Sequence, residues 1–402
     1  MIDATEKILK AIKLTLNLKK NTNTIGLHEP HFEDTNASKY INDCLESCWV
    51  SSSGNWVSRF EDQICKFTGA KYAIAVSNGT VGLRLSLHCI GVQAGDEVIT
   101  SPLTFVATAN AISHLGAYPH FVDINDWNLS LSSNSLAKRL KKIAIKKGNQ
   151  VFNTQTGRRI SAILPVHVFG MPADTIEIKK IAEEWGIPIV EDAAEALGSR
   201  HFIKKDVFIH AGLIGDIGVI SFNGNKLITT GGGGIVITNN ERLALKCKHL
   251  STTAKKKHRW EFDHDEIAWN DRMPNINAAL GFAQLEVIDK RLKQKYDLLK
   301  KYQKFFSEIQ EVEFILDKSK NINNYWLINI RSLIKDKKKA EYWKNNLLEK
   351  CHKNKILIRP AWKLLHKLEI YKDHPRSNLE IAEDQSYRIL SLQSSSNLFV
   401  AD

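Results

Sequence analysis

A single lysine, Lys226, stands in a polar, glycine-rich turn between two apolar runs at residues 219–220 and 235–237. Short apolar runs bounded by Gly and Asn predict buried strands rather than helices. An ammonium is costly to bury unless another group takes up its charge. An amine in a partly desolvated pocket becomes a nucleophile that can form a Schiff base. The local spacing alone favours an ordinary exposed hairpin lysine, and the rest of the chain decides against that interpretation.

Asp192 lies at the end of another apolar run, IPIVED. A carboxylate at such a position needs a cationic or hydrogen-bonding partner. A pyridinium N–H would be a suitable partner, and an arginine or the N-terminus of a helix would serve as well. The sequence therefore predicts a buried, partnered carboxylate and leaves its partner open.

Asn78, Gly79 and Thr80 follow an apolar strand pattern and precede a helical one. Backbone N–H groups, the positive helix end and a hydroxyl make a phosphate site there, although the same turn often only caps a helix. Phe105, near the start of the next helical pattern, could stack on a flat ring or pack in the core. The glycines at 231–234 lead into a strand, which favours a tight turn or a close backbone approach over a phosphate loop.

The elements that must position these residues alternate along the first part of the chain. Strands alternating with helices of ten to fifteen residues predict an α/β fold with a largely parallel sheet covered on both faces. Ligands of such sheets bind beyond the carboxyl ends of the strands, where the polar clusters lie. The strand patterns cover residues 71–76, 97–101, 118–124, 159–170 and 187–196, and the helical patterns cover residues 81–91, 104–116 and 174–186.

Two domains are expected, a large one at residues 1–275 and a smaller C-terminal α+β domain at 276–402. Residues 1–20 are amphipathic and predict a helix packed on the body, and the polar segment 145–159 predicts an inserted loop or hairpin. A 3.6-residue apolar pattern predicts one long helix from Asn275 toward Phe306 that links the domains. In the smaller domain, strands are expected at 312–316, 324–330 and 356–360, with a lysine-rich helix at 337–351.

The composition, with 43% hydrophobic and 25% charged residues in 402, is that of an ordinary globular protein. No apolar run reaches membrane-spanning length, so we expect no membrane segment. The six cysteines form no CxxC pair and no cluster with histidines, which predicts reduced thiols, a cytoplasmic location and no metal.

The formal net charge of +12 raises the question of nucleic-acid binding. The lysines are dispersed, however, and no nucleic-acid-binding motif accompanies them. A solvated basic face is the preferred interpretation, and no nucleic-acid partner is expected. A basic balance also suits a small anionic substrate.

A phosphate site, a buried carboxylate, an aromatic ring and a strand-end lysine at one sheet edge are the parts needed to hold pyridoxal 5′-phosphate. With these parts in place, the sequence resembles the DegT/StrS-type (DegT/DnrJ/EryC/StrS) family of pyridoxal phosphate-dependent nucleotide-sugar aminotransferases of fold type I. Ordered blocks from LHEPHF through NGT, EDAAEALGS and SFNGNK to ILSLQSSS carry the resemblance. The GNQVFNTQTGRR and SFNGNKLITTGGGG segments resemble the subgroup of legionaminic-acid and bacillosamine-type pathways.

The resemblance implies that Lys226 is the catalytic Schiff-base lysine and that Asp192 partners the pyridine nitrogen. It places Glu195 near the 3-hydroxyl of the cofactor ring. Gly79, Thr80 and Ser221 fall at phosphate-binding positions, Phe105 falls where an aromatic residue stacks on the ring, and Asn270 matches an asparagine that reaches the phosphate of the neighbouring subunit. A homodimer with shared active sites is therefore expected. Gly232, Asp271 and Gln393 depart from the usual family pattern, and none of these changes removes a catalytic group.

The resemblance further implies transfer of an amino group from glutamate to C4 of a 4-keto-6-deoxy nucleotide sugar. The expected acceptor is a UDP-linked N-acetyl sugar used for surface-polysaccharide or nonulosonate synthesis. One alternative is a related nucleotide-sugar 3-dehydratase, which carries histidine in place of the lysine, so Lys226 argues against it. The other is a non-catalytic pyridoxal phosphate-binding regulatory protein, which would need a DNA-binding module that the sequence does not reveal.

Overall fold

The structure is a computed structural model that describes residues 4–18 and 23–399. Within these ranges the N-terminal helix is confirmed as α1 (Ala4–Thr15). The remaining parts of that prediction, at residues 1–3 and 19–20, lie outside the described residues.

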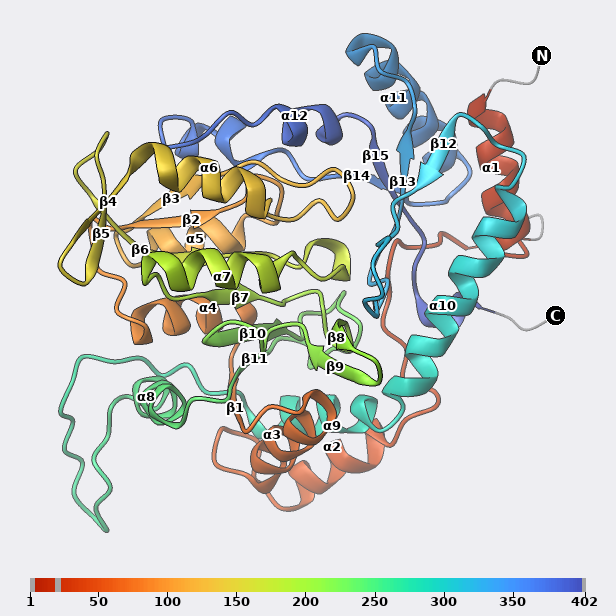
Figure 1. The fold of residues 1–402 in the computed structure, drawn as a ribbon. Coiled ribbons are helices and arrows are strands. Elements are labelled where there is room, and N and C mark those ends of the chain that lie inside the picture. The colour runs from red at the N-terminus through yellow and green to blue at the C-terminus, as the bar shows by residue number, and fades with distance from the viewer. Residues whose placement is uncertain (1–3, 19–22, 400–402) are drawn as a thin grey trace.

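A mainly parallel sheet forms the centre of the molecule (Figure 1). Its strands in spatial order are β1 (Tyr72–Val76), β11 (Gly234–Thr238), β10 (Ile217–Ser221), β7 (Val190–Asp192), β6 (Arg159–Leu164), β2 (Glu97–Thr100) and β3 (Tyr118–Phe121). Only β11 among these strands runs antiparallel to its neighbours. Parallel bridges between Ile163 and Ile189 and between Val166 and Asp192 join β6 to β7. The predicted α/β sheet is therefore confirmed.

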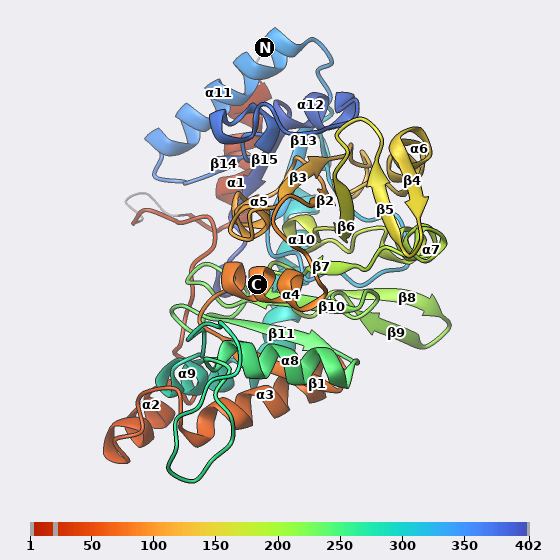
Figure 2. The same cartoon turned by 90° about the vertical axis from the view of Figure 1, so that its left-hand side faces the viewer.

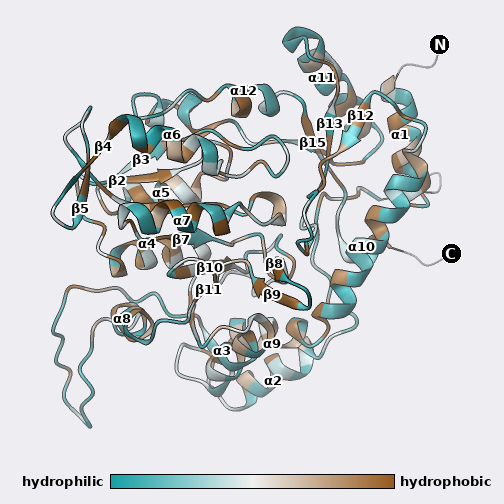
Figure 3. Cartoon of the chain, viewed as in Figure 1, coloured by the Kyte–Doolittle hydropathy of each residue, from teal (hydrophilic) through white to brown (hydrophobic). Residues whose placement is uncertain are grey.

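Helices cover both faces of this sheet, because successive strand side chains point to opposite sides. Val219 packs in the cluster beneath α4 (Gly79–Cys89), α5 (Ala107–Ser113) and α8 (Glu241–Ser251). The next residue, Ile220, packs in the opposite cluster. The helices of that opposite face are α2 (Ala37–Glu46), α3 (Asn55–Thr68), α9 (Asn275–Leu285), α6 (Ser133–Ile143) and α7 (Thr175–Trp185). Apolar residues accordingly gather on the strands and on the inward helix faces (Figure 3).

Two hairpins extend from the sheet region. The first consists of β4 (Ala144–Lys147) and β5 (Gln150–Asn153), and β5 pairs antiparallel with β6. This hairpin confirms the insertion predicted at residues 145–159. The second consists of β8 (Arg200–Lys204) and β9 (Val207–His210), and it projects beside the sheet (Figure 2).

The C-terminal part is built around a small antiparallel sheet in the order β12-β13-β15-β14. Its elements are α10 (Ile288–Phe305), β12 (Val312–Phe314), β13 (Ile328–Ser332), α11 (Lys337–Lys353), β14 (Arg359–Pro360), α12 (Glu380–Ser386) and β15 (Ile389–Leu392). Buried Ile8 and Ile12 of α1 belong to the same hydrophobic cluster as α10 and α11. The first helix thus packs on the C-terminal elements (Figure 1), and the domain boundary at residue 275 stays a prediction.

The prediction of one continuous helix from Asn275 to Phe306 was wrong. Helix α9 ends at Leu285 and α10 begins at Ile288, because Val287 leaves the helical conformation with φ −111° and ψ 12°. The two segments follow different surfaces: α9 packs on α2 and α3, and α10 packs on α1. A single straight helix would not follow both surfaces. The helix predicted at residues 104–116 also begins later, at Ala107, so that Phe105 precedes it.

In the described ranges, no helix combines the length and the apolar character that crossing a membrane requires.

Candidate functional site

A cavity of about 870 Å³ lies beyond the carboxyl ends of the central strands. Residues that follow β1, β2, β7 and β10 form its floor, and residues 359–363 of the C-terminal part form a further wall. The predicted site residues that line this cavity are Gly79, Thr80, Phe105, Asp192, Glu195, Ser221 and Lys226. The fold therefore brings together residues that lie as far apart in the chain as Gly79 and Lys226.

Lys226 lies in the turn after β10, where its side chain is only 13% exposed. Its Nζ is 3.3 Å from Oε1 of Glu195 and 3.9 Å from the ring centroid of Trp326. The ammonium is therefore enclosed by a carboxylate and an aromatic face, and an exposed hairpin lysine is excluded.

Glu195 is held on its other side by the backbone of Phe169, whose N–H donates to Oε2 at 2.8 Å. Phe169 has a positive φ of 57°, a conformation that non-glycine residues seldom adopt. Burial raises the pKa of Glu195, and the charge of Lys226 opposes that shift. The carboxylate is thus fixed in place for the lysine rather than exposed to water.

Asp192 ends β7 and lies on the cavity floor. The hydroxyl of Thr108 donates to Oδ2 at 2.7 Å, and the N–H of Ala194 donates to Oδ1 at 3.1 Å. Burial raises the pKa of Asp192, with the Thr108 hydrogen bond opposing the shift. A cationic N–H donor in the cavity would favour the charged carboxylate, so this position suits a pyridinium nitrogen.

The turn between β1 and α4 is shaped to bind an anion. Asn78 caps α4 by accepting a hydrogen bond from the N–H of Val81 at 2.9 Å. Gly79 and Thr80 open the helix, where backbone N–H groups have no intrahelical partner and attract anions. A Cβ on Gly79 would lie 2.9 Å from Cβ of Ser221, so only glycine allows this close approach.

The glycine run at 231–234, which leads into β11, lies against the turn between β1 and α4. A Cβ on Gly234 would lie 2.7 Å from the backbone N of Gly79. Strand β11 therefore begins directly against the anion-binding turn, and the predicted close backbone approach is confirmed.

Aromatic side chains that sequence reasoning missed line the cavity beside Phe105. Trp362 stacks on Phe169 with ring centroids 4.8 Å apart, and its ring lies 6.4 Å from that of Phe105. Trp326 covers Lys226, and its Nε1–H donates to the carbonyl of Asn225 at 2.7 Å. Both tryptophans come from the C-terminal part, and no local pattern relates them to the strands of the sheet.

Asn270 is not among the residues that line the cavity in the described part of the chain. Its side chain is exposed, and its Oδ1 accepts a hydrogen bond from Nε of Arg272 at 3.0 Å. The neighbouring Asp271 pairs with Arg84, and its carbonyl accepts the N–H of Ser77 at 2.7 Å. The Asp271 side chain thus fastens the segment to α4 and its backbone fastens it to the end of β1, and the role of Asn270 stays a prediction.

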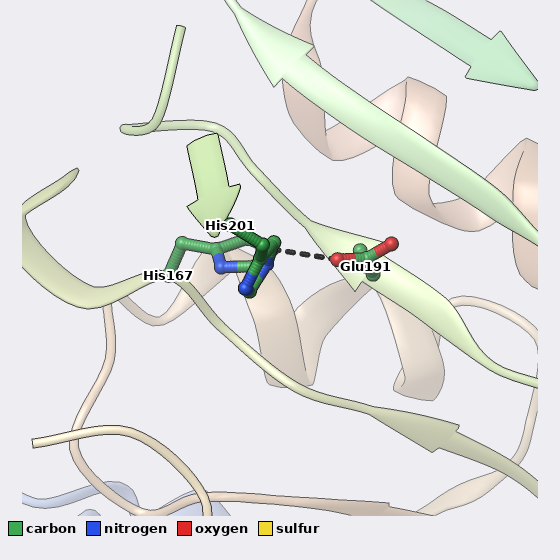
Figure 4. A group of neighbouring side chains, drawn as sticks. All are labelled: His167, Glu191 and His201. Carbon is green, nitrogen blue, oxygen red and sulfur yellow. Dashed lines mark hydrogen bonds and ion pairs between the residues drawn. The ribbon is translucent and has the colours of Figure 1, made fainter. Parts of the chain in front are cut away.

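His167, Glu191 and His201 form a buried cluster (Figure 4), and the cavity-lining residues Val166 and Asp192 are sequence neighbours of two of them. Nδ1 of His167 accepts the N–H of Ala173 at 2.9 Å, so Nε2 carries the proton and donates to Glu191 at 2.9 Å. Glu191 also accepts three backbone N–H groups of the 212–215 turn.

These hydrogen bonds occupy the lone pairs of His167 and Glu191 that a metal would need. Burial raises the pKa of Glu191, but its hydrogen bond from His167 and the backbone donors outweigh this effect and lower the pKa to about 2. The cluster therefore serves as a hydrogen-bonded support for β7 and Asp192.

The sequence profile of the DegT/DnrJ/EryC1/StrS aminotransferase family matches residues 32–402. A GDP-perosamine synthase of Escherichia coli O157:H7 is 35% identical over 357 residues, which cover 89% of each chain. Another from Vibrio cholerae is 34% identical over 376 residues, covering 92% of this chain and 94% of the relative.

The structure of PseC from Helicobacter pylori, an aminotransferase of pseudoaminic acid biosynthesis, superposes with a TM-score of 0.81. Its sequence is 25% identical, and the match covers 93% of this chain and 95% of PseC.

Proposed function

Because the chain belongs to the DegT/DnrJ/EryC1/StrS family of pyridoxal phosphate-dependent sugar aminotransferases, we propose that it transfers an amino group from glutamate to C4 of a 4-keto-6-deoxy nucleotide sugar. The observation that carries this proposal is the single cavity that holds Lys226, the buried Asp192 and the anion-binding turn at Gly79. These groups match the aldehyde, the ring nitrogen and the phosphate of the cofactor.

The cavity fits pyridoxal phosphate. The N–H groups of Gly79 and Thr80 with the hydroxyl of Ser221 would hold the phosphate, Asp192 would hold the ring nitrogen, and Phe105 would cover the ring. When bound, the cofactor supplies an aldehyde that condenses with amines and a ring that withdraws electrons from the bond being broken.

Lys226 is the proton-transfer group of the proposed reaction. Its Nζ accepts a proton from Cα of the donor amino acid. In the second half of the reaction it delivers a proton to C4 of the acceptor sugar. Oε1 of Glu195, 3.3 Å away, stabilises the ammonium that forms. Trp326 and Trp362 limit the access of water to these groups.

The proposed acceptor is a UDP-linked 2-acetamido-4-keto-6-deoxy sugar of surface-polysaccharide or nonulosonate synthesis, and the subgroup resemblance of the sequence supports it. The relatives named GDP-perosamine synthase favour a GDP-linked acceptor as a second candidate. Arg359 and Lys363 are exposed at the cavity and would suit the diphosphate of either nucleotide.

We also propose a homodimer with shared active sites. Residues 255–268 form a long excursion after α8 that extends away from the body (Figure 1). Its apolar side chains are strongly exposed, with Trp260 at 69%, Phe262 at 76% and Ile267 at 93%. Apolar groups exposed together mark a contact surface, and the excursion leads directly to Asn270.

The free thiols of all six cysteines support a cytoplasmic location.

The test of the function uses the purified, pyridoxal phosphate-loaded protein. Glutamate should discharge the yellow colour and yield an equivalent of 2-oxoglutarate. The UDP-linked N-acetyl sugar should then restore the colour faster than a GDP-linked analogue with a 2-hydroxyl group, with nitrogen at C4 of the product by NMR. Preference for the hydroxyl sugar, or equal rates, would move the chain to another branch of the family. Absence of any reaction with glutamate would contradict the proposal itself.

A further inference from the structure

A short N-terminal segment, residues 23–29, runs between the cavity and the small antiparallel sheet. Backbone hydrogen bonds join Ile25 to Lys355 and Leu357 at 2.9 and 3.0 Å, and the carbonyl of Leu27 accepts the N–H of Ser394 at 2.7 Å. The N–H of Glu29 donates to Oγ of Ser395 at 2.7 Å. The backbone on both sides of residue 28 is therefore fixed.

This fixed segment places His28 in the wall of the cavity, where the residue is only 9% exposed. Neither Nδ1 nor Nε2 has a hydrogen-bond partner among the described residues. The carbonyl of Asn225, which accepts from Nε1 of Trp326, also lies near the ring and favours its protonated form, without the geometry of a hydrogen bond to either ring nitrogen. A buried polar group without a partner is destabilising, so an imidazole fixed here is expected to gain its partners when a ligand binds.

The surroundings of His28 keep its ring neutral. Burial lowers the pKa of His28 well below 6.5, and the charges of Lys295, Lys226 and Arg291 lower it further. A neutral imidazole offers one N–H donor and one acceptor nitrogen. A carboxylate or a phosphate only accepts hydrogen bonds and would leave the acceptor nitrogen unpaired. Neutral substituents of a sugar ring carry both donors and acceptors.

We propose that His28 is a substrate-positioning residue whose two ring nitrogens hydrogen-bond neutral substituents of the acceptor sugar, either ring hydroxyls or an acetamido group. This assignment rests on the proposed aminotransferase function. It makes His28 a contact for the sugar and leaves the amino donor untouched. Loss of the hydrogen bonds should therefore weaken sugar binding and spare the reaction with glutamate.

The test compares His28→Phe, which keeps a flat ring without hydrogen bonds, with His28→Asn, which keeps a donor and an acceptor. His366→Phe is the matched control, because His366 is also buried with an unpartnered Nδ1 and does not line the cavity. The holoenzyme is studied in two half-reactions, first with glutamate and then with the 2-acetamido and 2-hydroxyl sugars. Equilibrium binding of the aminated nucleotide sugar, by calorimetry, gives a readout independent of turnover.

We expect His28→Phe to raise KM and the product Kd at least tenfold, with the glutamate half-reaction within twofold of wild type. His28→Asn should recover part of the loss, and the control should resemble wild type. A loss confined to the 2-acetamido sugar assigns the contact to the acetamido group, and an equal loss for both sugars assigns it to ring hydroxyls.

Unchanged sugar binding in a folded His28→Phe protein would overturn the assignment, as would an equal loss in the glutamate half-reaction. If His28→Phe does not fold, His28→Asn decides by the same two measurements. A wild-type protein that reacts with glutamate but aminates neither sugar would instead overturn the proposed acceptor, and the role of His28 would fall with it.

Discussion

The ammonium of Lys226 and the carboxylate of Glu195 lie together in one enclosed space, so the charge of each group stabilises the charge of the other. Burial raises the pKa of Glu195, and the lysine charge favours its ionised form. A ligand that converts the Lys226 ammonium to an uncharged group removes this stabilisation of the Glu195 carboxylate. Glu195 is then expected to take up a proton more readily, which would let it donate a hydrogen bond to the 3-hydroxyl oxygen of the bound ring.

Borohydride reduction of the holoenzyme should attach the cofactor irreversibly to Lys226. Only this lysine combines a position on the cavity floor with a carboxylate partner among the described lysines that line the cavity. Peptide mapping by mass spectrometry identifies the labelled residue, and Lys226→Ala serves as the unlabelled control. Label on Lys363, the other lysine lining the cavity, would refute the assignment.

Asp192→Asn should keep the fold and lose most of the turnover. The amide can retain the hydrogen bond from Ala194, and Thr108 can reverse its hydroxyl because Thr104 lies 2.9 Å from it. A neutral amide does not hold a pyridine nitrogen protonated, so the chemical step should slow far more than tenfold. Thermal melting checks the fold, and single-turnover rates check the chemistry. A rate within about tenfold of wild type corresponds to a loss of less than about 1.4 kcal/mol in transition-state stabilisation. Such a rate would show that Asp192 has only a structural role.

Sequence reasoning could find Lys226 and Asp192 because each is a charged residue at the end of an apolar strand pattern or in the turn that follows one. It could not find His28, because the residue lies in a segment without periodicity. The partners that fix this segment are more than 300 residues away in the chain, such as Lys355 and Ser394. Trp326 and Trp362 were missed for the same reason: their meaning depends on how the C-terminal part packs over the sheet.

At the scale of elements, the segment that follows β6 meets β7 and β8 at the buried cluster of His167, Glu191 and His201. The cluster links the strand that carries Asp192 to its neighbours through hydrogen bonds that need a neutral histidine and an ionised glutamate. The position of Asp192 thus depends on the hydrogen bonds of its neighbour Glu191 and of His167.

Lowering the pH from 6.5 to 4 should reduce the free energy of unfolding. Burial lowers the pKa of His201 to about 4 and that of His210 to about 3. In this window the unfolded chain binds protons that the folded chain does not, so stability falls as the pH falls. Lowering the pKa of His201 from 6.5 to about 4 makes its contribution to this loss on the order of 3 kcal/mol. Below pH 4.5, Glu191 adds a further loss as the pH falls toward its folded pKa of about 2.

Urea unfolding at several pH values measures this slope. His201→Phe should flatten the slope between pH 6.5 and 4 by up to one proton. Phe202→Leu on the same strand changes no titratable group and should leave the slope unchanged. A His201→Phe protein with the wild-type slope would show that His201 takes up its proton without unfolding.

The element pattern of the sheet could be predicted because its strands are apolar and its helices have regular periodicity. The break between α9 and α10 could not, since residues 275–306 keep an apolar repeat through Val287 and only tertiary packing selects the bend. The small strand β15 was missed as a strand, because its four residues, Ile389–Leu392, are too few to establish a period.

For the whole molecule, the excursion at residues 255–268 extends away from the body (Figure 1), and its exposed apolar side chains are not among the residues that line the cavity. In the proposed dimer a second copy of the chain covers this surface, and the family resemblance implies that Asn270 then reaches the cofactor site of that copy. In the proposed dimer, one contact therefore both joins the subunits and completes the active site.

Mixing Lys226→Ala with Asn270→Ala subunits should restore part of the activity that each variant lacks alone. One of the two sites in a hybrid dimer would carry both native residues. Subunit exchange is verified with differently tagged chains, and activity is measured before and after exchange. No recovery in verified hybrids would mean that Asn270 acts within its own chain or has no role in the site.

Phe262→Asp should shift the protein toward the monomer, because a charge would have to be buried at the proposed contact. Sedimentation velocity measures the change. Tyr342→Asp is a matched control, since Tyr342 is 74% exposed on α11 in the C-terminal part. An unchanged dimer in Phe262→Asp would place the contact elsewhere on the surface.

The packing of α1 on α10 and α11 has a consequence for how the protein is made. The ribosome adds roughly 270 residues between the end of α1 and the start of α10, which takes about 15–55 s at typical elongation rates. During this interval Ile8, Leu9 and Ile12 have no native surface to cover them. Helix α1 is therefore synthesised long before the helices that bury it, and its apolar face is open to chaperones during this interval.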